Sequence, residues 1–210
     1  FGLPGLEVLE AAGNRLIGLP TGPWACGRLR RLDLAGNRLG PGLPRCLGSC
    51  QVLRELSLAQ NALEDVGDLF AVPAGHGWCS SLLSLDISTN KLGPSLKVSG
   101  LETLDTLNIS FNRITRLEMA GAFPRLSAII AESNQIREFP SSLMPASAPL
   151  LSTLDLLNNS ISVLPPELGL STALKRVALV GNPLRSIRPE LLRGSVEGLK
   201  KFLRSRIEGA

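Results

Sequence analysis

The sequence predicts an α/β solenoid with a parallel concave β-sheet, short helices or turns on the convex side, and a C-terminal capping helix. Three observations predict it. An eleven-residue pattern, Leu-x-x-Leu-x-Leu-x-x-Asn-x-Leu/Ile, occurs eight times along the 210 residues. Successive copies are 22 to 29 residues apart, and a helical pattern follows the last copy. Repetition at this period is typical of a solenoid, in which each repeat packs only against its neighbours.

Each copy of the pattern predicts one short strand. Its leucines alternate, as Leu154 and Leu156 do, and alternate residues of a strand share a face. A strand this short cannot bury that face alone, so parallel stacking must cover each leucine layer with the next. We assign residues 1–184 to eight repeats and 185–210 to the cap. The predicted strands are 6–11, 29–34, 53–58, 82–87, 104–109, 126–131, 151–156 and 174–179.

An asparagine recurs near the end of every copy, at the point where the backbone is expected to turn away from the strand. Its amide can donate to and accept from main-chain groups that the turn leaves unpaired, and a buried unpaired group costs about 1–3 kcal/mol. We interpret these residues as an internal structural ladder and not as binding sites. The ladder comprises Asn14, Asn37, Asn61, Asn90, Asn112, Asn134, Asn159 and Asn182.

The return between the third and fourth repeats, residues 63–81, is longer than its neighbours. We expect it to extend a convex helix at 65–72 and to continue as a loop. His76, which lies beside glycines, is read as a surface residue because no partner for a ligand or catalytic role is evident. Trp24 and Trp78 are expected to fill the core.

The return after the seventh repeat, SVLPPELGLSTAL, has a Leu-Pro-x-x-Leu cadence: Pro165 and Pro166 open a turn, and Leu168 and Leu170 are expected to face inward. With this element and repeats near 23 residues, the chain from Leu6 onward resembles the intracellular leucine-rich-repeat proteins of the Ras-group type. Its final segment, NPLRSIRPELLRGSVEGLKKFLRSRI, is similar to the helical cap of some members. The resemblance implies the fold but names no partner, because such proteins bind very different molecules.

The cap carries the net charge of +4. Apolar residues at spacings of three and four predict that one helix face covers the last repeat: Leu192, Val196, Leu199, Phe202, Leu203 and Ile207. The opposite, basic face comprises Lys200, Lys201, Arg204 and Arg206. It is either an ordinary solvated side or a dock for an acidic partner, nucleic acid or an anionic membrane surface. Nucleic acid is disfavoured because no aromatic residues other than Phe202 interleave with these charges.

The four cysteines, Cys26, Cys46, Cys50 and Cys79, form neither a CxxC pair nor a clustered cap. We interpret them as buried free thiols of an intracellular, cytoplasmic protein. No apolar run approaches the roughly 18–20 residues that a membrane-spanning helix needs. The chain begins with Phe and its first repeat starts almost at once, so we expect it to be part of a longer protein.

Catalytic chemistry is not expected. The sequence holds one His, no Tyr, and none of the common metal, phosphate-loop or nucleophile motifs, so we predict no enzyme, no metal site and no cofactor. Acidic residues recur after the second leucine, as Glu10, Asp33, Asp86 and Asp155, but other repeats interrupt the row. A solvated strand face is the favoured interpretation over paired catalytic carboxylates.

The outward strand positions form the candidate binding surface. They are small or polar in the first five repeats and become apolar from there on, and large apolar residues aimed at water suggest a partner. The alternatives are ordinary isolated exposure, or cover by chain outside this stretch. The hypothetical partner-binding residues are Phe111, Ile130, Glu132, Leu157, Arg176, Ala178 and Val180.

We therefore predict a non-catalytic protein–protein interaction module, an intracellular scaffold or adaptor that binds a protein on its concave face. The alternative is an architectural subunit of a large assembly, held through the basic cap and the convex insertion. A third possibility is the non-catalytic repeat region of an enzyme, which upstream domains would decide.

Overall fold

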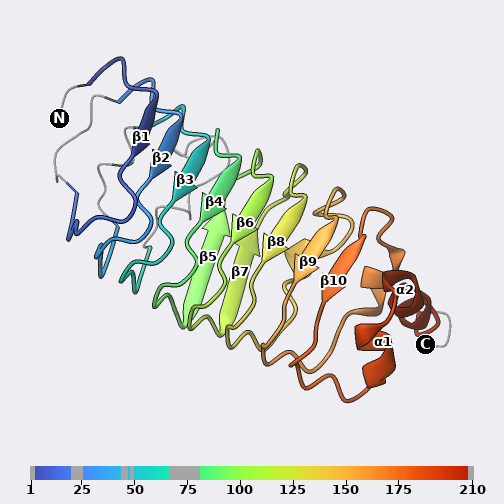
Figure 1. The fold of residues 1–210 in the computed structure, drawn as a ribbon. Coiled ribbons are helices and arrows are strands. Elements are labelled where there is room, and N and C mark those ends of the chain that lie inside the picture. Colours follow the sequence, from blue (N-terminus) through green and yellow to red (C-terminus); the bar gives the residue numbers. More distant parts are fainter. Residues whose placement is uncertain (1–2, 20–25, 44–46, 48–49, 67–80, 208–210) are drawn as a thin grey trace.

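The computed structural model describes residues 3–19, 26–43, 47, 50–66 and 81–207, and it shows a solenoid (Figure 1). Within these residues, eight strands form one parallel sheet in the order β1-β2-β3-β4-β6-β8-β9-β10. One strand lies inside each predicted range: β1 (Val8–Glu10), β2 (Arg31–Asp33), β3 (Glu55–Ser57), β4 (Ser84–Asp86), β6 (Thr106–Asn108), β8 (Ala128–Ile130), β9 (Thr153–Asp155) and β10 (Arg176–Ala178). The predicted fold class is confirmed.

The leucines of the pattern align from strand to strand. Leu32 pairs with Leu56, and Leu56 pairs with Leu85, so equivalent positions stack in register. These three side chains are at most 2% exposed. Because burial of apolar surface is the main force that stabilises a fold, each leucine layer stabilises the repeat on either side of it.

The ladder asparagines connect neighbouring repeats. Asn112 Nδ2 donates to the carbonyls of Ile87 (3.1 Å), Ile109 (3.0 Å) and Ser110 (3.1 Å), and its Oδ1 accepts from Leu92 N–H (3.0 Å). Ile87 and Leu92 belong to the preceding repeat, so one side chain satisfies main-chain groups of two coils. Equivalent bonds occur at Asn37, Asn61, Asn90, Asn134, Asn159 and Asn182.

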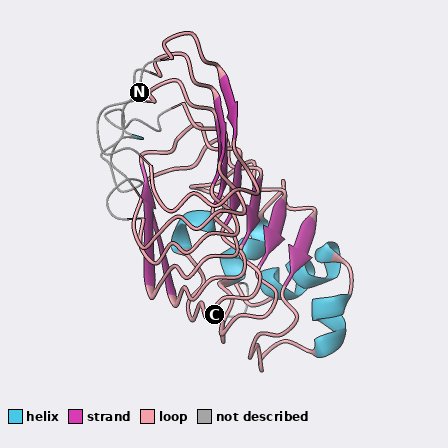
Figure 2. Ribbon diagram, turned by 60° about the vertical axis from the view of Figure 1, so that its left-hand side comes forward, coloured by secondary structure: helices cyan, strands magenta, loops and turns pink. Residues whose placement is uncertain are grey.

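A second parallel sheet, which we did not predict, lies on the other side of the solenoid (Figure 2). Among the described residues it consists of β5 (Ser95–Ser99) and β7 (Arg116–Ala120). Their alternating pattern buries Leu96 and Val98 of β5 in the core, together with Leu117 and Met119 of β7. The ladder asparagines of these repeats, Asn90, Asn112 and Asn134, are only 22 residues apart. Because so short a repeat leaves too little chain for a convex helix, the return runs extended.

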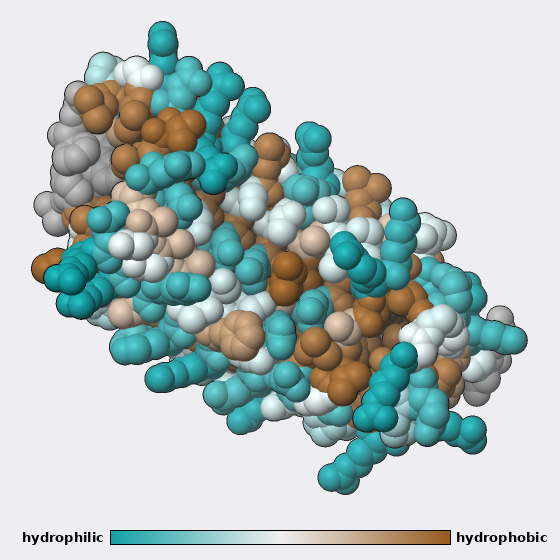
Figure 3. Space-filling view, in the orientation of Figure 1, coloured by the Kyte–Doolittle hydropathy of each residue, from teal (hydrophilic) through white to brown (hydrophobic). Residues whose placement is uncertain are grey.

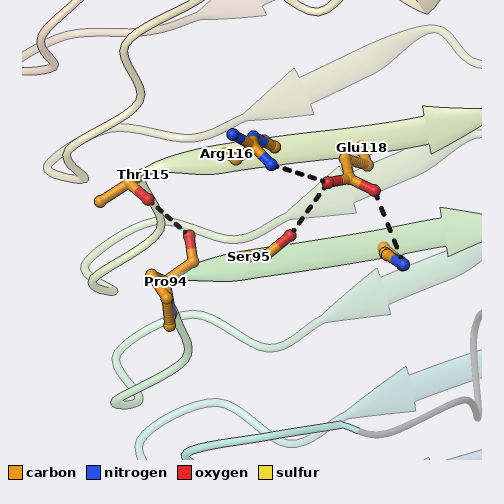
Figure 4. Close-up of polar contacts among 6 residues, drawn as sticks. Pro94, Ser95, Thr115, Arg116 and Glu118 are labelled. Atoms are coloured by element: carbon orange, nitrogen blue, oxygen red, sulfur yellow. Dashed lines mark hydrogen bonds and ion pairs between the residues drawn. The ribbon is translucent and has the colours of Figure 1, made fainter.

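Polar contacts cover the outer face of this second sheet (Figure 4). Ser95 Oγ donates to Glu118 at 3.3 Å, and Arg116 and Lys97 approach the same carboxylate at 3.7 and 3.9 Å. Thr115 Oγ1 donates to the carbonyl of Pro94 at 2.9 Å. These are exposed pairs, and each contributes little to stability because water screens it.

The other convex returns in the described part of the chain include two 3₁₀ helices, η3 (Ser141–Leu143) and η4 (Pro166–Leu170). Leu168 is buried as predicted, but Leu170 is 54% exposed, against our expectation. A 3₁₀ helix has three residues per turn, so positions two apart point about 120° away from each other and cannot share a face. Trp24, His76, Trp78 and most of the predicted helix at 65–72 lie outside the described residues.

The cap consists of two helices, where the sequence suggested one. In the part described, they are α1 (Pro189–Arg193) and α2 (Val196–Arg204). The break falls at Gly194 and Ser195, because the Ser195 side chain caps α2 by accepting from Gly198 N–H at 3.1 Å. Leu199 and Leu203 are buried, and α2 packs on η4.

The sequence predicts that Lys200 lies on the solvated face of the cap. This prediction is wrong, because Lys200 is only 5% exposed. The reason is that η4 approaches α2 closely at this point: a Cβ added to Gly169 would lie 2.7 Å from the carbonyl oxygen of Lys200. Lys200 Nζ is 2.9 Å from Glu197 Oε1. The hydrogen bond from Lys200 and its positive charge hold the pKa of the Glu197 carboxyl below its ordinary value.

Gly169→Ala is expected to destabilise the docking of the cap. Its methyl group would collide with the main chain of α2, which cannot move without separating α2 from η4, and overpacking of this kind costs about 1–3 kcal/mol. Gly198→Ala, within α2 itself, is the control: its Cβ would meet only the Ser195 hydroxyl at 3.3 Å and a Leu191 methyl at 3.9 Å, so we expect a change below about 1 kcal/mol. Urea unfolding followed by circular dichroism compares the two variants; equal effects would contradict the packing described here.

Candidate functional site

The acidic row on the exposed face of the main sheet is local and structural. Asp33, Asp86 and Asp155 each accept a hydrogen bond from the main-chain N–H two residues ahead, at 3.0, 2.9 and 3.1 Å. Asn108 makes the same contact with Ser110 at 3.2 Å. Because an amide side chain substitutes for the carboxylates in this role, the row serves to shape the turn after each strand.

Charged residues on the N-terminal half of this face pair with one another. Arg31 lies 3.5 Å from Glu10 and 3.6 Å from Glu55 across neighbouring strands. Cross-strand pairs of opposite charge stabilise a sheet by a few tenths of a kcal/mol. This half of the face is therefore polar, and Arg31 pairs with two of its carboxylates.

The C-terminal half of the same face carries the predicted apolar residues. Ile130 of β8 pairs with Asp155 of β9, and Leu157 lies two residues after Asp155. Asn158 N–H donates to the carbonyl of Val180 at 2.9 Å, which places Leu157 and Val180 side by side in adjacent repeats. Ile130 and Leu157 are half-buried and Val180 is 38% exposed. Figure 3 shows hydrophobic surface on the half of the molecule that carries β8, β9 and β10.

The remaining predicted residues lie around this cluster. Ala178 is half-buried opposite Asp155, and Glu132 is half-buried in the repeat before Leu157. Arg176 is exposed, and its Nε donates to Thr153 Oγ1 at 3.2 Å. We call the seven predicted residues the sheet-face patch: Phe111, Ile130, Glu132, Leu157, Arg176, Ala178 and Val180.

Phe111 has an unusual backbone conformation. The residue before each ladder asparagine is left-handed in all eight repeats, with Gly at three of these positions. Phe111 has φ +54° at this position, and its side chain is 52% exposed. A left-handed conformation costs a non-glycine residue about 1–2 kcal/mol, so neither burial nor backbone preference explains a phenylalanine here. The alternation of apolar and polar residues along the strands does not predict this left-handed conformation of Phe111.

The predicted basic face of the cap is smaller in the structure than in the sequence. Lys200 is buried, and Arg206 stacks 4.8 Å from the centre of the Phe202 ring while its Nη2 donates to the carbonyl of Ser186 at 3.3 Å. Lys201 and Arg204 are exposed. Two of the four cations therefore make internal contacts and are less available to a partner.

Other kinds of site have no support in the described part of the chain. No cluster of three or more His, Cys, Asp or Glu residues there could hold a metal ion. Nor does any helix in that part reach the length and apolar character that crossing a bilayer requires. Cys26 is a buried free thiol and Cys50 is buried, whereas Cys46 and Cys79 lie outside the described residues.

Comparison with known proteins identifies the repeats. The family described as Leucine Rich Repeat matches residues 28–50, and a second, described as Leucine Rich repeat, matches residues 49–67. Transforming growth factor beta activator LRRC32 of Mus musculus is 34% identical over 201 residues, which cover 87% of this chain and 28% of that protein. The chain thus spans less than a third of this curated relative.

Solved structures agree in fold. A leucine-rich-repeat protein of Leptospira interrogans superposes with a TM-score of 0.62 at 22% identity. The superposition covers 97% of this chain and 54% of the Leptospira chain. YopM from Yersinia enterocolitica superposes with a TM-score of 0.60 at 28% identity, and the superposition covers 85% of this chain and 34% of the YopM chain. With its eight-copy motif, its asparagine ladder and these matches, the chain belongs to the leucine-rich-repeat proteins, whose fold is generally a protein–protein interaction module.

Proposed function

We propose that this chain is a non-catalytic scaffold or adaptor that binds a protein partner through the sheet-face patch. One observation carries the proposal: Ile130, Leu157 and Val180 lie together on one half of the sheet face, whereas the other half is mostly polar. Full burial of an aliphatic side chain contributes about 1.5–3 kcal/mol. Burying the exposed parts of three such side chains supplies the apolar centre that a protein interface needs.

The polar members of the patch suit its edge. Arg176 is exposed and Glu132 is half-buried, so both can bond to a partner at the rim, where polar contacts fix orientation more than affinity. A cytoplasmic location is part of the proposal and is supported by the buried free thiol of Cys26.

The test compares two charge substitutions in the same repeat. Leu157→Asp places a carboxylate in the sheet-face patch, whereas Val163→Asp places one on a residue that is 67% exposed in the return of that repeat. Each variant of the full-length protein is used for affinity purification with cross-linking mass spectrometry, and binding of the recovered partner is then measured with purified components. We expect Leu157→Asp to weaken binding at least tenfold, about 1.4 kcal/mol, and Val163→Asp to leave it unchanged.

Ile130→Asp should repeat the effect of Leu157→Asp, and urea unfolding of all variants separates loss of binding from loss of folding. If folded Leu157→Asp and Ile130→Asp retain every partner, the sheet-face patch is not the binding site. If Lys201→Glu/Arg204→Glu then removes the partners, the alternative of an architectural subunit held by its cap replaces this proposal.

A further inference from the structure

A second surface, separate from the sheet-face patch, lies along the edge where the strands of the main sheet begin. It is a groove of about 790 Å³ that crosses the first to sixth repeats. Its lining residues precede the strands by one to four positions, whereas the ladder asparagines follow the strands. The groove is lined by Glu7, Gly27, Arg28, Arg30, Val52, Arg54, Ser81, Leu83, Thr103 and Arg125.

The main chain fixes the spacing of these residues. Arg30 N–H donates to the carbonyl of Glu7 at 2.7 Å, Arg54 N–H to that of Arg30 at 2.8 Å, and Leu83 N–H to that of Arg54 at 2.8 Å. Successive members of this row therefore stand one coil apart, about 4.8 Å. Arg28, Val52 and Arg125 belong to a parallel row two residues earlier in their repeats.

The groove is strongly positive. It has four arginines, all exposed, against the single carboxylate of Glu7. In the described part of the chain, none of these four guanidinium groups takes part in an ion pair, in contrast to Arg31, which is paired on both sides. Arg30 and Arg54 occupy equivalent positions in adjacent coils, so their like charges repel each other. An anion in the groove would remove that repulsion.

We propose that this groove binds an acidic peptide segment in an extended conformation. Four coil steps separate the repeat of Arg28 and Arg30 from that of Arg125, about 19 Å, which matches roughly six residues of extended peptide. Arginine binds carboxylates through two parallel hydrogen bonds, so acidic side chains at intervals along the peptide would each find a guanidinium. Val52 and Leu83 offer aliphatic contact between the charged positions.

The lining chemistry favours peptide over single-stranded nucleic acid. Proteins that bind single strands without sequence preference stack the bases on aromatic side chains, and none of the ten lining residues is aromatic.

The test uses a fluorescein-labelled peptide of ten glutamates and fluorescence anisotropy in low and physiological salt. Arg30→Glu/Arg54→Glu is expected to weaken binding at least tenfold and to reduce its salt dependence. Arg38→Glu/Arg113→Glu makes the same charge change at two exposed arginines that directly follow ladder asparagines, beyond the other ends of the strands. It should alter the affinity less than threefold. Arg125→Glu, distant from the first pair but in the same groove, should also weaken binding severalfold.

Two results would overturn the proposal. Equal losses in the groove and control variants would show that binding follows net charge, and tighter binding of a ten-nucleotide single-stranded DNA would assign the groove to nucleic acid. Leu157→Asp should bind the glutamate peptide normally, so the outcome is independent of the fate of the sheet-face patch.

Discussion

Gly93→Ala is expected to lower the free energy of unfolding by roughly 3–5 kcal/mol, the largest effect among the substitutions considered. Gly93 has φ +152°, in a region that other residues rarely adopt. A Cβ built on it would lie 2.8 Å from the carbonyl carbon of Arg113 in the next repeat and closer still to its oxygen. That carbonyl cannot retreat, because Arg113 N–H and Thr115 N–H donate to Leu92 and Pro94 at 2.9 and 2.7 Å on either side.

Gly121→Ala separates the two causes of this loss. Gly121 also has a left-handed backbone, φ +94°, but a Cβ there would meet nothing within 4 Å. Only the backbone strain remains, so we expect a loss of about 1–2 kcal/mol. Urea unfolding curves of both variants, with midpoints and slopes fitted separately, provide the comparison. A loss no greater for Gly93→Ala would mean that the two coils do not approach as closely as described.

Asn112→Ala is expected to cost roughly 2–4 kcal/mol, most of it from one buried donor. Leu92 N–H would lose the Asn112 Oδ1 acceptor at 3.0 Å and have no water to replace it, because Leu92 is buried. The carbonyls are affected less, since each has a second donor: Ile87 keeps Asn90, and Ile109 keeps Asn134.

Asn14→Ala is the matched control at the same position of the first repeat. Asn14 is exposed, and within the described residues it donates only to the carbonyls of Ala11 and Ala12 in its own repeat, at 3.0 and 3.1 Å. We expect a loss below about 1 kcal/mol, measured by the same unfolding experiment. Similar losses at both positions would argue that the inter-repeat bond to Leu92 contributes little.

The strands could be predicted because their cause is local in the sequence. Leu154 and Leu156 define a face by alternation, and repetition at nearly constant spacing brings equivalent faces together. The sheet-face patch was predicted for the same reason, since Ile130 and Leu157 alternate with the buried residues of their repeats. Whether a partner uses this patch depends on a second molecule, so it remains a prediction.

The second sheet was missed because its cause lies between repeats. The segments SLKVS and RLEMA alternate as strands do, but each is only five residues long and pairs with nothing in its own repeat. Only the stacking of coils brings Leu96 opposite Leu117. The basic groove was overlooked in the same way, because Arg30, Arg54 and Arg125 are far apart in sequence and meet only along the stacked strand starts.

The sequence by itself determined the strand positions and the direction in which each strand residue faces, because the alternation of inward and outward residues acts within a single coil. The tertiary structure alone decided the environments that depend on contact between coils. It buried Lys200 by placing η4 against α2, and it gathered four exposed arginines into one groove. Charge and burial at those positions result from which backbone lies next to them, and one repeat read alone does not contain that information.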